Sequence, residues 1–274
     1  MFKSILIGID ASEQSKYAQA LGFHLAHRLQ ARVLGLHVIN VLALEPPLPD
    51  DISESGDFEP YLDSLPTREQ LAQGGRQLLA EFAELAGREG VNAETLLEFG
   101  LVGDCLVQHS RSADLTLMGR GGSHHTPELG QAADTVVRNS SNTVLLCPGP
   151  VSQLRHLVLA YDGSERAAKA MHSAAALASA LAARISVVSV ARDAKAAERY
   201  LDEAREYLGT YGLQTDYHAL TGAPGQHIVE FADQAQADGI FLGAHGHSRV
   251  VEMVLGSTTE YVLRHSRRAL LLCH

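Results

Sequence analysis

The residues with the clearest chemical potential lie in the stretch GAHGHSRVVEMVLGST of the second half. Gly243 ends the apolar run IFLG and Gly246 follows three residues later, and Gly256, Ser257 and Thr258 then open a segment of helix-forming residues. Glycine lets backbone N–H groups approach a phosphate closely, and the first N–H groups of a helix attract anions. The stretch therefore predicts a phosphate-binding loop. Turn formation at the glycines and helix capping by Ser257 would explain the same residues without a ligand, so the spacing alone leaves both interpretations open.

The elements that would position this loop alternate between strands and helices. The runs HLVLAYD and RISVVSV are continuously apolar, which is typical of strands buried on both faces. The intervening ERAAKAMHSAAALASALAA has a helix-forming composition, with Asp162 or Ser164 as its N-cap. This alternation predicts a parallel sheet with helices on both faces, whose ligands bind beyond the carboxyl ends of the strands. Further strands are expected at 215–220, 239–243 and 269–273, and helices near 195–211, 225–236 and 257–265.

A carboxylate marks the end of another strand of this sheet. Asp162 follows the first strand of the second half, and Gly243 ends the fourth. Both would therefore lie at the edge where such sheets bind ligands. A carboxylate repels phosphate oxygens, but it accepts hydrogen bonds from ribose hydroxyls or an adenine amino group. Asp162 opposite the glycine loop favours a nucleotide over a simple turn.

The sequence contains an internal repeat. Segments 5–38 and 157–190 align without a gap, and ten of the 34 positions are identical. Further on, ADLTLMG matches ADGIFLG, and the two halves end on TVLLC and ALLLC. The first half has an extra segment around 42–66, rich in proline, acid and serine, which predicts a mobile loop. With a boundary at CPGPVSQ, we expect two domains of one fold, residues 1–149 and 153–274.

Composition and charge exclude several classes of partner. The formal net charge is −10 and no run is rich in Lys or Arg, which disfavours nucleic acids and acidic membrane surfaces. No apolar run approaches the ~18 residues that would span a bilayer, and the N-terminal MFKSILIGID leaves no room for a signal peptide. The three cysteines provide no disulfide framework. We therefore expect a cytoplasmic protein without nucleic-acid or membrane partners.

The repeat and the loop together resemble a tandem universal stress protein of the UspA-like family over essentially the whole chain, apart from the segment around 42–66. The resemblance rests on LVLAYDGSERA as first strand and turn, on ADGIFLG as fourth strand, and on a phosphate motif. That motif is Gly-x2-Gly-x9-Gly-(Ser/Thr), and Gly243, Gly246, Gly256 and Ser257 match it without deviation.

The resemblance implies a fold and a ligand. The fold is α/β, with two tandem open, doubly wound parallel five-stranded sheets of the adenine nucleotide alpha hydrolase-like type. They would pack through their last strands as an internal pseudo-dimer, and a homodimer of the whole chain stays open. The implied ligand is ATP, with Mg²⁺ held by its phosphates. The implied contacts are Ala160, Asp162 and Val190 at the adenosine, and Gly243, His245, Gly246, Gly256, Ser257 and Thr258 around ribose and phosphates.

The first half departs from the phosphate motif. In GRGGSHHTPELGQ the two spaced glycines are followed by only seven residues before Gly130, and Gln131 stands where the second half has Ser257. The shorter loop and the bulkier side chain predict that this half does not hold a triphosphate in the same way. Asp10 and Val38 remain at the adenosine end. We expect this half to be vestigial or to bind another ligand.

No catalytic constellation accompanies the loop, because the chain has no Walker lysine beside Gly256 and no nucleophile elbow. Arg249 is the only basic residue in the loop and the one candidate for assisting ATP hydrolysis. His124-His125 and the pair His245 and His247 are interpreted as loop histidines rather than metal ligands. The favoured function is an ATP-binding stress-response or signalling protein with an unidentified protein partner. A nucleotide-independent interaction scaffold and a slow ATPase are the alternatives.

Overall fold

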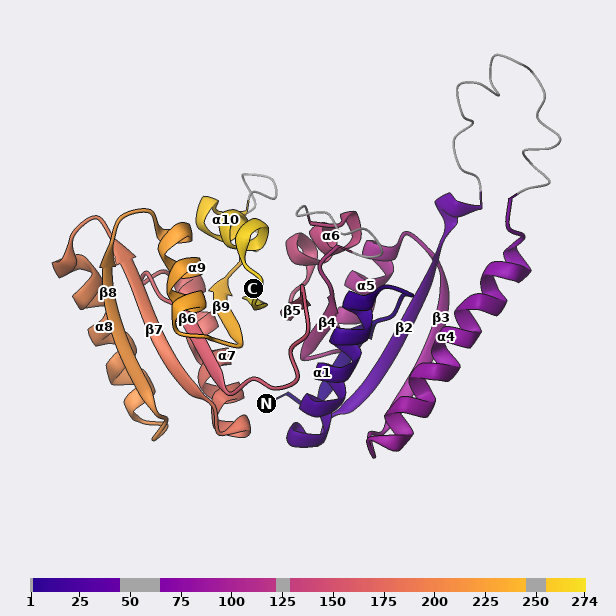
Figure 1. Cartoon of the computed structure of the whole chain (residues 1–274), viewed down its shortest axis with the longest axis horizontal. Coiled ribbons are helices and arrows are strands. Elements are labelled where there is room, and N and C mark those ends of the chain that lie inside the picture. The colour runs from indigo at the N-terminus through magenta and orange to yellow at the C-terminus, as the bar shows by residue number, and fades with distance from the viewer. Residues whose placement is uncertain (1, 45–64, 122–128, 245–254) are drawn as a thin grey trace, which may run out of the picture.

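The computed structural model describes residues 2–44, 65–121, 129–244 and 255–274. The first half contains β1 (Ser4–Gly8), α1 (Glu13–Leu29), β2 (Arg32–Asn40), the short 3₁₀ helix η1 (Val41–Ala43), α4 (Arg68–Arg88), β3 (Ala93–Gly100), α5 (Val102–Ser110), β4 (Leu115–Gly119), α6 (Gln131–Asn139) and β5 (Thr143–Cys147). The second half contains β6 (His156–Ala160), α7 (Glu165–Leu181), β7 (Arg184–Ala191), α8 (Ala194–Gly209), β8 (Thr215–Thr221), α9 (Pro224–Gln234), β9 (Gly239–Gly243), α10 (Ser257–His265) and β10 (Ala269–Cys273). Each half alternates strands and helices, as expected (Figure 1).

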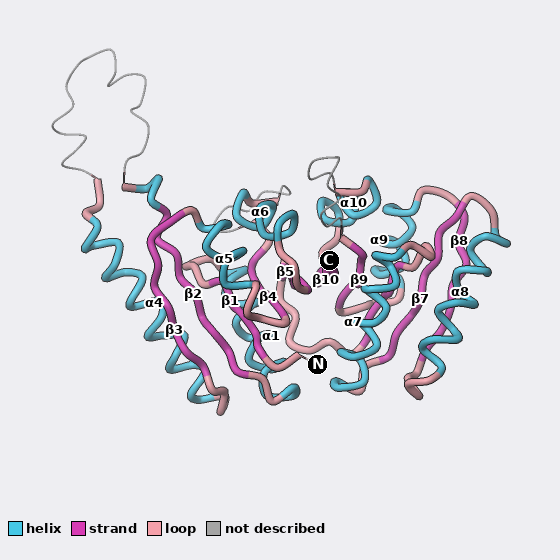
Figure 2. Tube along the Cα trace, turned by 180° about the vertical axis from the view of Figure 1, so that it is seen from behind, coloured by secondary structure: helices cyan, strands magenta, loops and turns pink. Residues whose placement is uncertain are grey.

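The ten described strands form one sheet in the order β3-β2-β1-β4-β5-β10-β9-β6-β7-β8. Within each half the neighbouring strands are parallel. The halves join through antiparallel pairing of β5 with β10, in which Leu145 lies opposite Leu271. The expected pair of doubly wound five-stranded sheets and their packing as an internal pseudo-dimer are confirmed. The structure adds that the two sheets are continuous (Figures 1 and 2).

The helices that follow the first strand of each half begin in the same way. Ser12 and Ser164 are the N-caps of α1 and α7, and each hydroxyl accepts a hydrogen bond from the backbone N–H three residues on. A cap of this kind contributes about 1 kcal/mol. Asp10 and Asp162 instead accept the N–H groups of these two serines, at 2.8 and 3.0 Å. Of the two candidate caps, the structure therefore assigns Ser164, and Asp162 lies before the helix.

Two apolar cores lie on the two faces of the sheet. One packs α1, α4, α7 and α8 against the strands, and the other packs α5, α6, α9 and α10. Each core contains residues from both halves, and every residue of β5 and β10 is buried. A fully buried Leu side chain contributes about 1.5–3 kcal/mol, so this junction is an apolar interface. Among the described residues, no helix combines the length and apolar character needed to cross a membrane.

Candidate functional site

A cavity of about 430 Å³ lies at the carboxyl ends of β1, β2 and β4 in the first half. Its apolar wall includes Leu36, Val38, Leu106 and Met118, all buried. The first residues of α5 and α6 complete its rim. The volume is in the usual range for small-molecule sites, and the carboxyl edge is where parallel α/β sheets bind ligands. The fold therefore builds a ligand-sized cavity at the predicted edge.

The internal repeat relates this cavity to the predicted site of the second half. The strand registers agree, because Gly8 lies opposite Leu36 and Ala160 lies opposite Val188. Six residues lining the first-half cavity have counterparts among the predicted nucleotide contacts: Gly8 and Ala160, Asp10 and Asp162, Val38 and Val190, Gly119 and Gly243, Gly130 and Gly256, Gln131 and Ser257. The structure thus places these second-half residues together, at the ends of β6, β7 and β9 and at the start of α10.

The remaining predicted contacts divide into described and undescribed residues. Thr258 lies in the first turn of α10. His245 and Gly246 lie outside the described residues, as do the catalytic candidate Arg249 and the histidines at 124, 125 and 247. In the part of the chain that is described, no three His, Cys, Asp or Glu side chains are arranged to hold a metal ion.

The start of α10 has the geometry of an anion site. Gly256 is the N-cap, with φ −61° and ψ 146°, and no side chain caps the helix. Ser257 is the first helical residue and is exposed, so the explanation that it only caps the helix is wrong. The unpaired N–H groups of a first turn and the helix dipole favour a negative group. The Thr259 hydroxyl donates to the Gly243 carbonyl at 3.4 Å and so ties the start of α10 to the end of β9.

The glycine that ends the fourth strand of each half also has a packing role. A Cβ at Gly243 would lie 2.6 Å from the carbonyl carbon of Arg166, and a Cβ at Gly119 would lie 2.9 Å from Cβ of Gln14. Such distances are too short for two carbon atoms that are not bonded. Glycine is therefore needed at both positions for α1 and α7 to pack on the strand ends, with or without a ligand.

Both halves match the model of one family, the universal stress protein family, at residues 1–148 and 153–274. The chain belongs to the universal stress protein family. A relative from Synechocystis sp., universal stress protein Slr1230, is 25% identical over 276 residues, which cover 96% of each chain. The crystal structure of a universal stress protein from Archaeoglobus fulgidus has a TM-score of 0.78 and 23% identity, over 98% of this chain and 95% of that chain. A structure from Pseudomonas aeruginosa has a TM-score of 0.67 and 17% identity, over 99% of this chain and 93% of that one. These two likenesses bear on the fold alone.

Charge distinguishes the two halves of this universal stress protein. Four further pairs of equivalent positions, in or beside the first-half cavity, carry different charges: Gln14 and Arg166, Asn40 and Arg192, Asp104 and Gln226, and Arg120 and Ala244. The second half gains two cations, Arg166 and Arg192, and lacks both the carboxylate of Asp104 and the cation of Arg120, so it remains the more positive of the two, which favours an anionic ligand there. Arg166 and Arg192 were not among the predicted site residues. Comparing the two copies of the repeat for charge would have found them.

The glycine-rich loop after β4 of the first half is bonded to a side chain of α1. Gln14 of α1 is buried, and its Oε1 accepts a hydrogen bond from the Gly121 backbone N–H at 2.8 Å. The Gly130 N–H donates to the Arg120 carbonyl at 2.9 Å. The bond from Gly121 to Gln14 uses a backbone donor of the glycine-rich segment, and arginine stands at the position of Gln14 in the second half. This gives a structural reason for the expectation that the first half does not hold a triphosphate.

Proposed function

We propose that this universal stress protein binds ATP in its second half, at the carboxyl ends of β6, β7 and β9, and acts in stress response or signalling through nucleotide occupancy. The observation that carries the proposal is the position of the first turn of α10, which begins at Ser257 and is joined to the end of β9 through Thr259. A phosphate would accept hydrogen bonds from the backbone N–H groups of this turn and from the Ser257 hydroxyl. The cations Arg166 and Arg192 stand at two positions that are neutral in the first half.

The other end of the nucleotide would lie against β6 and β7. Asp162 is exposed, and its Oδ1 accepts the Ser164 N–H. Its second oxygen would accept a ribose hydroxyl or an adenine amino group. Ala160 and Val190 supply the apolar surface for adenosine, and Mg²⁺ would be held by the phosphates. His245 and Gly246 belong to the same proposal through the sequence motif alone.

Position within the fold supports a signalling role. One end of α10 would hold the phosphates, and the other end contacts the first half. Arg120 Nη1 donates to the Leu263 carbonyl at 3.0 Å and to the Ser266 carbonyl at 3.1 Å. A nucleotide that fixes the start of α10 would thus act on a helix of the second half that also contacts the first half. A protein partner that binds there could sense whether the nucleotide site is occupied.

Calorimetric titration with Mg-ATP tests the ATP site. Ser257→Ala removes one hydrogen bond to a charged group, so the Kd should rise about ten- to hundred-fold. The matched control is Gln131→Ala at the equivalent position of the first half, and it should leave the ATP affinity within about two-fold of the wild-type value. Two equivalent ATP sites, or an unchanged Kd for Ser257→Ala, would contradict the assignment.

A further inference from the structure

The first-half cavity keeps the shape of a binding site. It has the volume of a small-molecule pocket and a buried apolar wall. Gly8, Asp10 and Val38 line it at the positions of Ala160, Asp162 and Val190 in the second half. The part of the site that would face a base and a sugar is therefore retained, although the phosphate motif is altered.

The charged groups around this cavity disfavour an anion. Asp10 and Asp104 both line it and are exposed, and neither forms an ion pair within the described part of the chain. The described cation among the lining residues, Arg120, directs its Nη1 to two carbonyls at the end of α10 in the other half. Its positive charge is therefore engaged with the carboxyl end of that helix.

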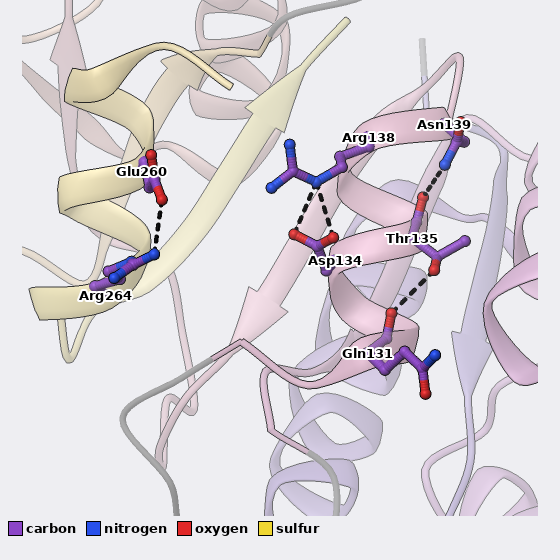
Figure 3. Close-up of polar contacts among 7 residues, drawn as sticks. All are labelled: Gln131, Asp134, Thr135, Arg138, Asn139, Glu260 and Arg264. Carbon is purple, nitrogen blue, oxygen red and sulfur yellow. Dashed lines mark hydrogen bonds and ion pairs between the residues drawn. The ribbon is translucent and has the colours of Figure 1, made fainter. Parts of the chain in front are cut away.

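The two helices that begin at the rim do not reverse this preference. The starts of α5 and α6 would each attract a negative group. In α5, however, Asp104 stands in the first turn, whereas α9, the equivalent helix of the second half, has no acid there. The first turn of α6 holds Asp134 as that of α10 holds Glu260, so this helix does not distinguish the two halves. Asp134 is paired with Arg138 at 2.8 Å, whereas the Gln131 carboxamide points away from this pair (Figure 3). The Gly121 N–H is already bonded to Gln14, so this backbone donor is not open to a phosphate.

We propose that the first-half cavity binds an uncharged ligand rich in hydrogen-bond donors, of the nucleoside class, rather than a nucleotide. The second carboxylate oxygen of Asp10 and the carboxylate of Asp104 accept hydroxyl or amino protons, and Gln131 adds a carboxamide at the rim. The apolar wall receives the base. The nucleoside identity rests on the proposed function of the second half, whereas the exclusion of phosphate rests on the first half alone.

Adenosine and AMP serve as probes in calorimetric titrations of the full chain saturated with Mg-ATP, so that the second-half site is filled. We expect one equivalent of adenosine to bind, with AMP at least about ten-fold weaker. Asp10→Asn should weaken adenosine about ten- to hundred-fold, because it replaces a charged acceptor. The matched Asp162→Asn in the second half should leave this adenosine binding unchanged. The proposal would be overturned if AMP bound as tightly as adenosine, or if no adenosine bound at millimolar concentration. It would also be overturned if Asp162→Asn abolished adenosine binding and Asp10→Asn did not.

A second variant tests the charge argument in the opposite direction. Asn40→Arg combined with Asp104→Gln places second-half residues at the rim of the first-half cavity. The preference for adenosine over AMP should shrink or reverse, and an unchanged preference would contradict the assigned cause.

The ATP site proposed for the second half and the nucleoside site proposed for the first half can be tested independently. If the wild-type protein binds no Mg-ATP, the ATP proposal is wrong. The same adenosine titrations without ATP, compared between wild type, Asp10→Asn and Asp162→Asn, still decide the first-half site.

Discussion

Single residues give the two repeated halves different chemistry, and a hydrogen-bond network around the buried His156 and Ser186 in the second half is a further example. Arg184 Nη2 lies 2.9 Å from His156 Nδ1, and His156 Nε2 lies 2.7 Å from Ser186 Oγ. Ser186 in turn donates to the Asp216 carboxylate at 2.9 and 3.0 Å. Arginine can only donate and a carboxylate only accepts, so the shorter contact with Arg184 makes Nδ1 an acceptor and Nε2 a donor, although the Ala235 carbonyl also lies 3.2 Å from Nδ1. This arrangement requires a neutral imidazole.

The surroundings of His156 hold it in this neutral form. Burial lowers the pKa of His156 below its usual value of 6.5, and the neighbouring Arg184 guanidinium lowers it further. The Ala235 carbonyl and the carboxylates of Asp216 and Asp238 oppose this shift and are outweighed. The folded protein therefore takes up a proton at His156 at a lower pH than the unfolded chain does.

We expect this difference to make stability depend on pH. The contribution of neutral His156 is fully present above about pH 6.5 and is lost as the pH falls below it, because the unfolded chain binds the proton first. His156→Gln should therefore lose less stability than the wild type between about pH 7.5 and pH 5.5, measured as urea midpoints. His24, whose pKa is also lowered by burial, contributes equally to both proteins and cancels. Equal midpoint shifts in wild type and variant would show that His156 is not responsible.

At the scale of elements, local patterns predict most of the second half. Expected strands at 215–220, 239–243 and 269–273 are β8, β9 and β10, and the three expected helices begin and end within two residues of α8, α9 and α10. The buried strands are short apolar runs and the helices begin after recognisable caps or glycines, so period and composition suffice. The order of the ten strands and the contact of Arg120 with α10 depend on the distant packing of two halves, which no local pattern encodes.

The candidate site was predictable to a similar extent. Glycine spacing and Asp162 point to one edge of the sheet, and the structure brings the described residues together there. The contributions of Arg166, Arg192 and Gln14 were not predicted. Each lies near the end of a strand or the start of a helix, in a segment without a recognisable motif. Whether its side chain contributes to the site depends on the residues that pack beside it in the fold.

Neighbouring glycines in α4 allow a matched test of packing at this scale. Gly74 is exposed, and a Cβ there would meet nothing within 4 Å. Gly75 is buried, and a Cβ would lie 2.7 Å from both His37 Cδ2 and Leu97 Cδ1. His37 has little freedom to move, because its Nδ1 is bonded to the Ile9 carbonyl at 2.7 Å. The same substitution therefore has opposite consequences at adjacent positions.

We expect Gly74→Ala to raise the free energy of unfolding by about 0.5–1 kcal/mol, since alanine loses less backbone entropy in a helix. Gly75→Ala makes the same gain but adds overpacking that costs about 1–3 kcal/mol, so its net effect should be destabilising. Urea denaturation of the two variants beside the wild type measures both changes. Variants that shift in the same direction would mean that α4 packs on β2 and β3 more loosely than the structure shows.

For the whole molecule, the two halves share one sheet and two apolar cores. β5 pairs with β10, and both cores cross the junction. Arg120 reaches from the first half to the end of α10, and burial lowers the pKa of its guanidinium without a carboxylate partner among the described residues. The pairs Asp134–Arg138 and Glu260–Arg264 stand on the facing helices α6 and α10 (Figure 3), and Glu260 adds to the effect of Asp134 in raising the pKa of Arg138. Both pairs lie within a single helix, so they do not join the halves directly, and the apolar strands provide most of the association.

The covalent link between the halves should therefore be dispensable once the protein has folded. A protease recognition sequence inserted after Gly149, where the structure has open space, allows the folded chain to be cut. The two fragments should remain together in size-exclusion chromatography at micromolar concentration, because separation would expose the fully buried Leu145 and Leu271 and two unpaired strand edges. Arg120→Met in the cut protein should weaken the association by about ten-fold or more, through loss of hydrogen bonds from a charged donor, whereas Arg111→Met on the exposed surface should not. Fragments that elute separately and remain folded by circular dichroism would mean that each half is an independent domain and that the β5–β10 pairing depends on the linker.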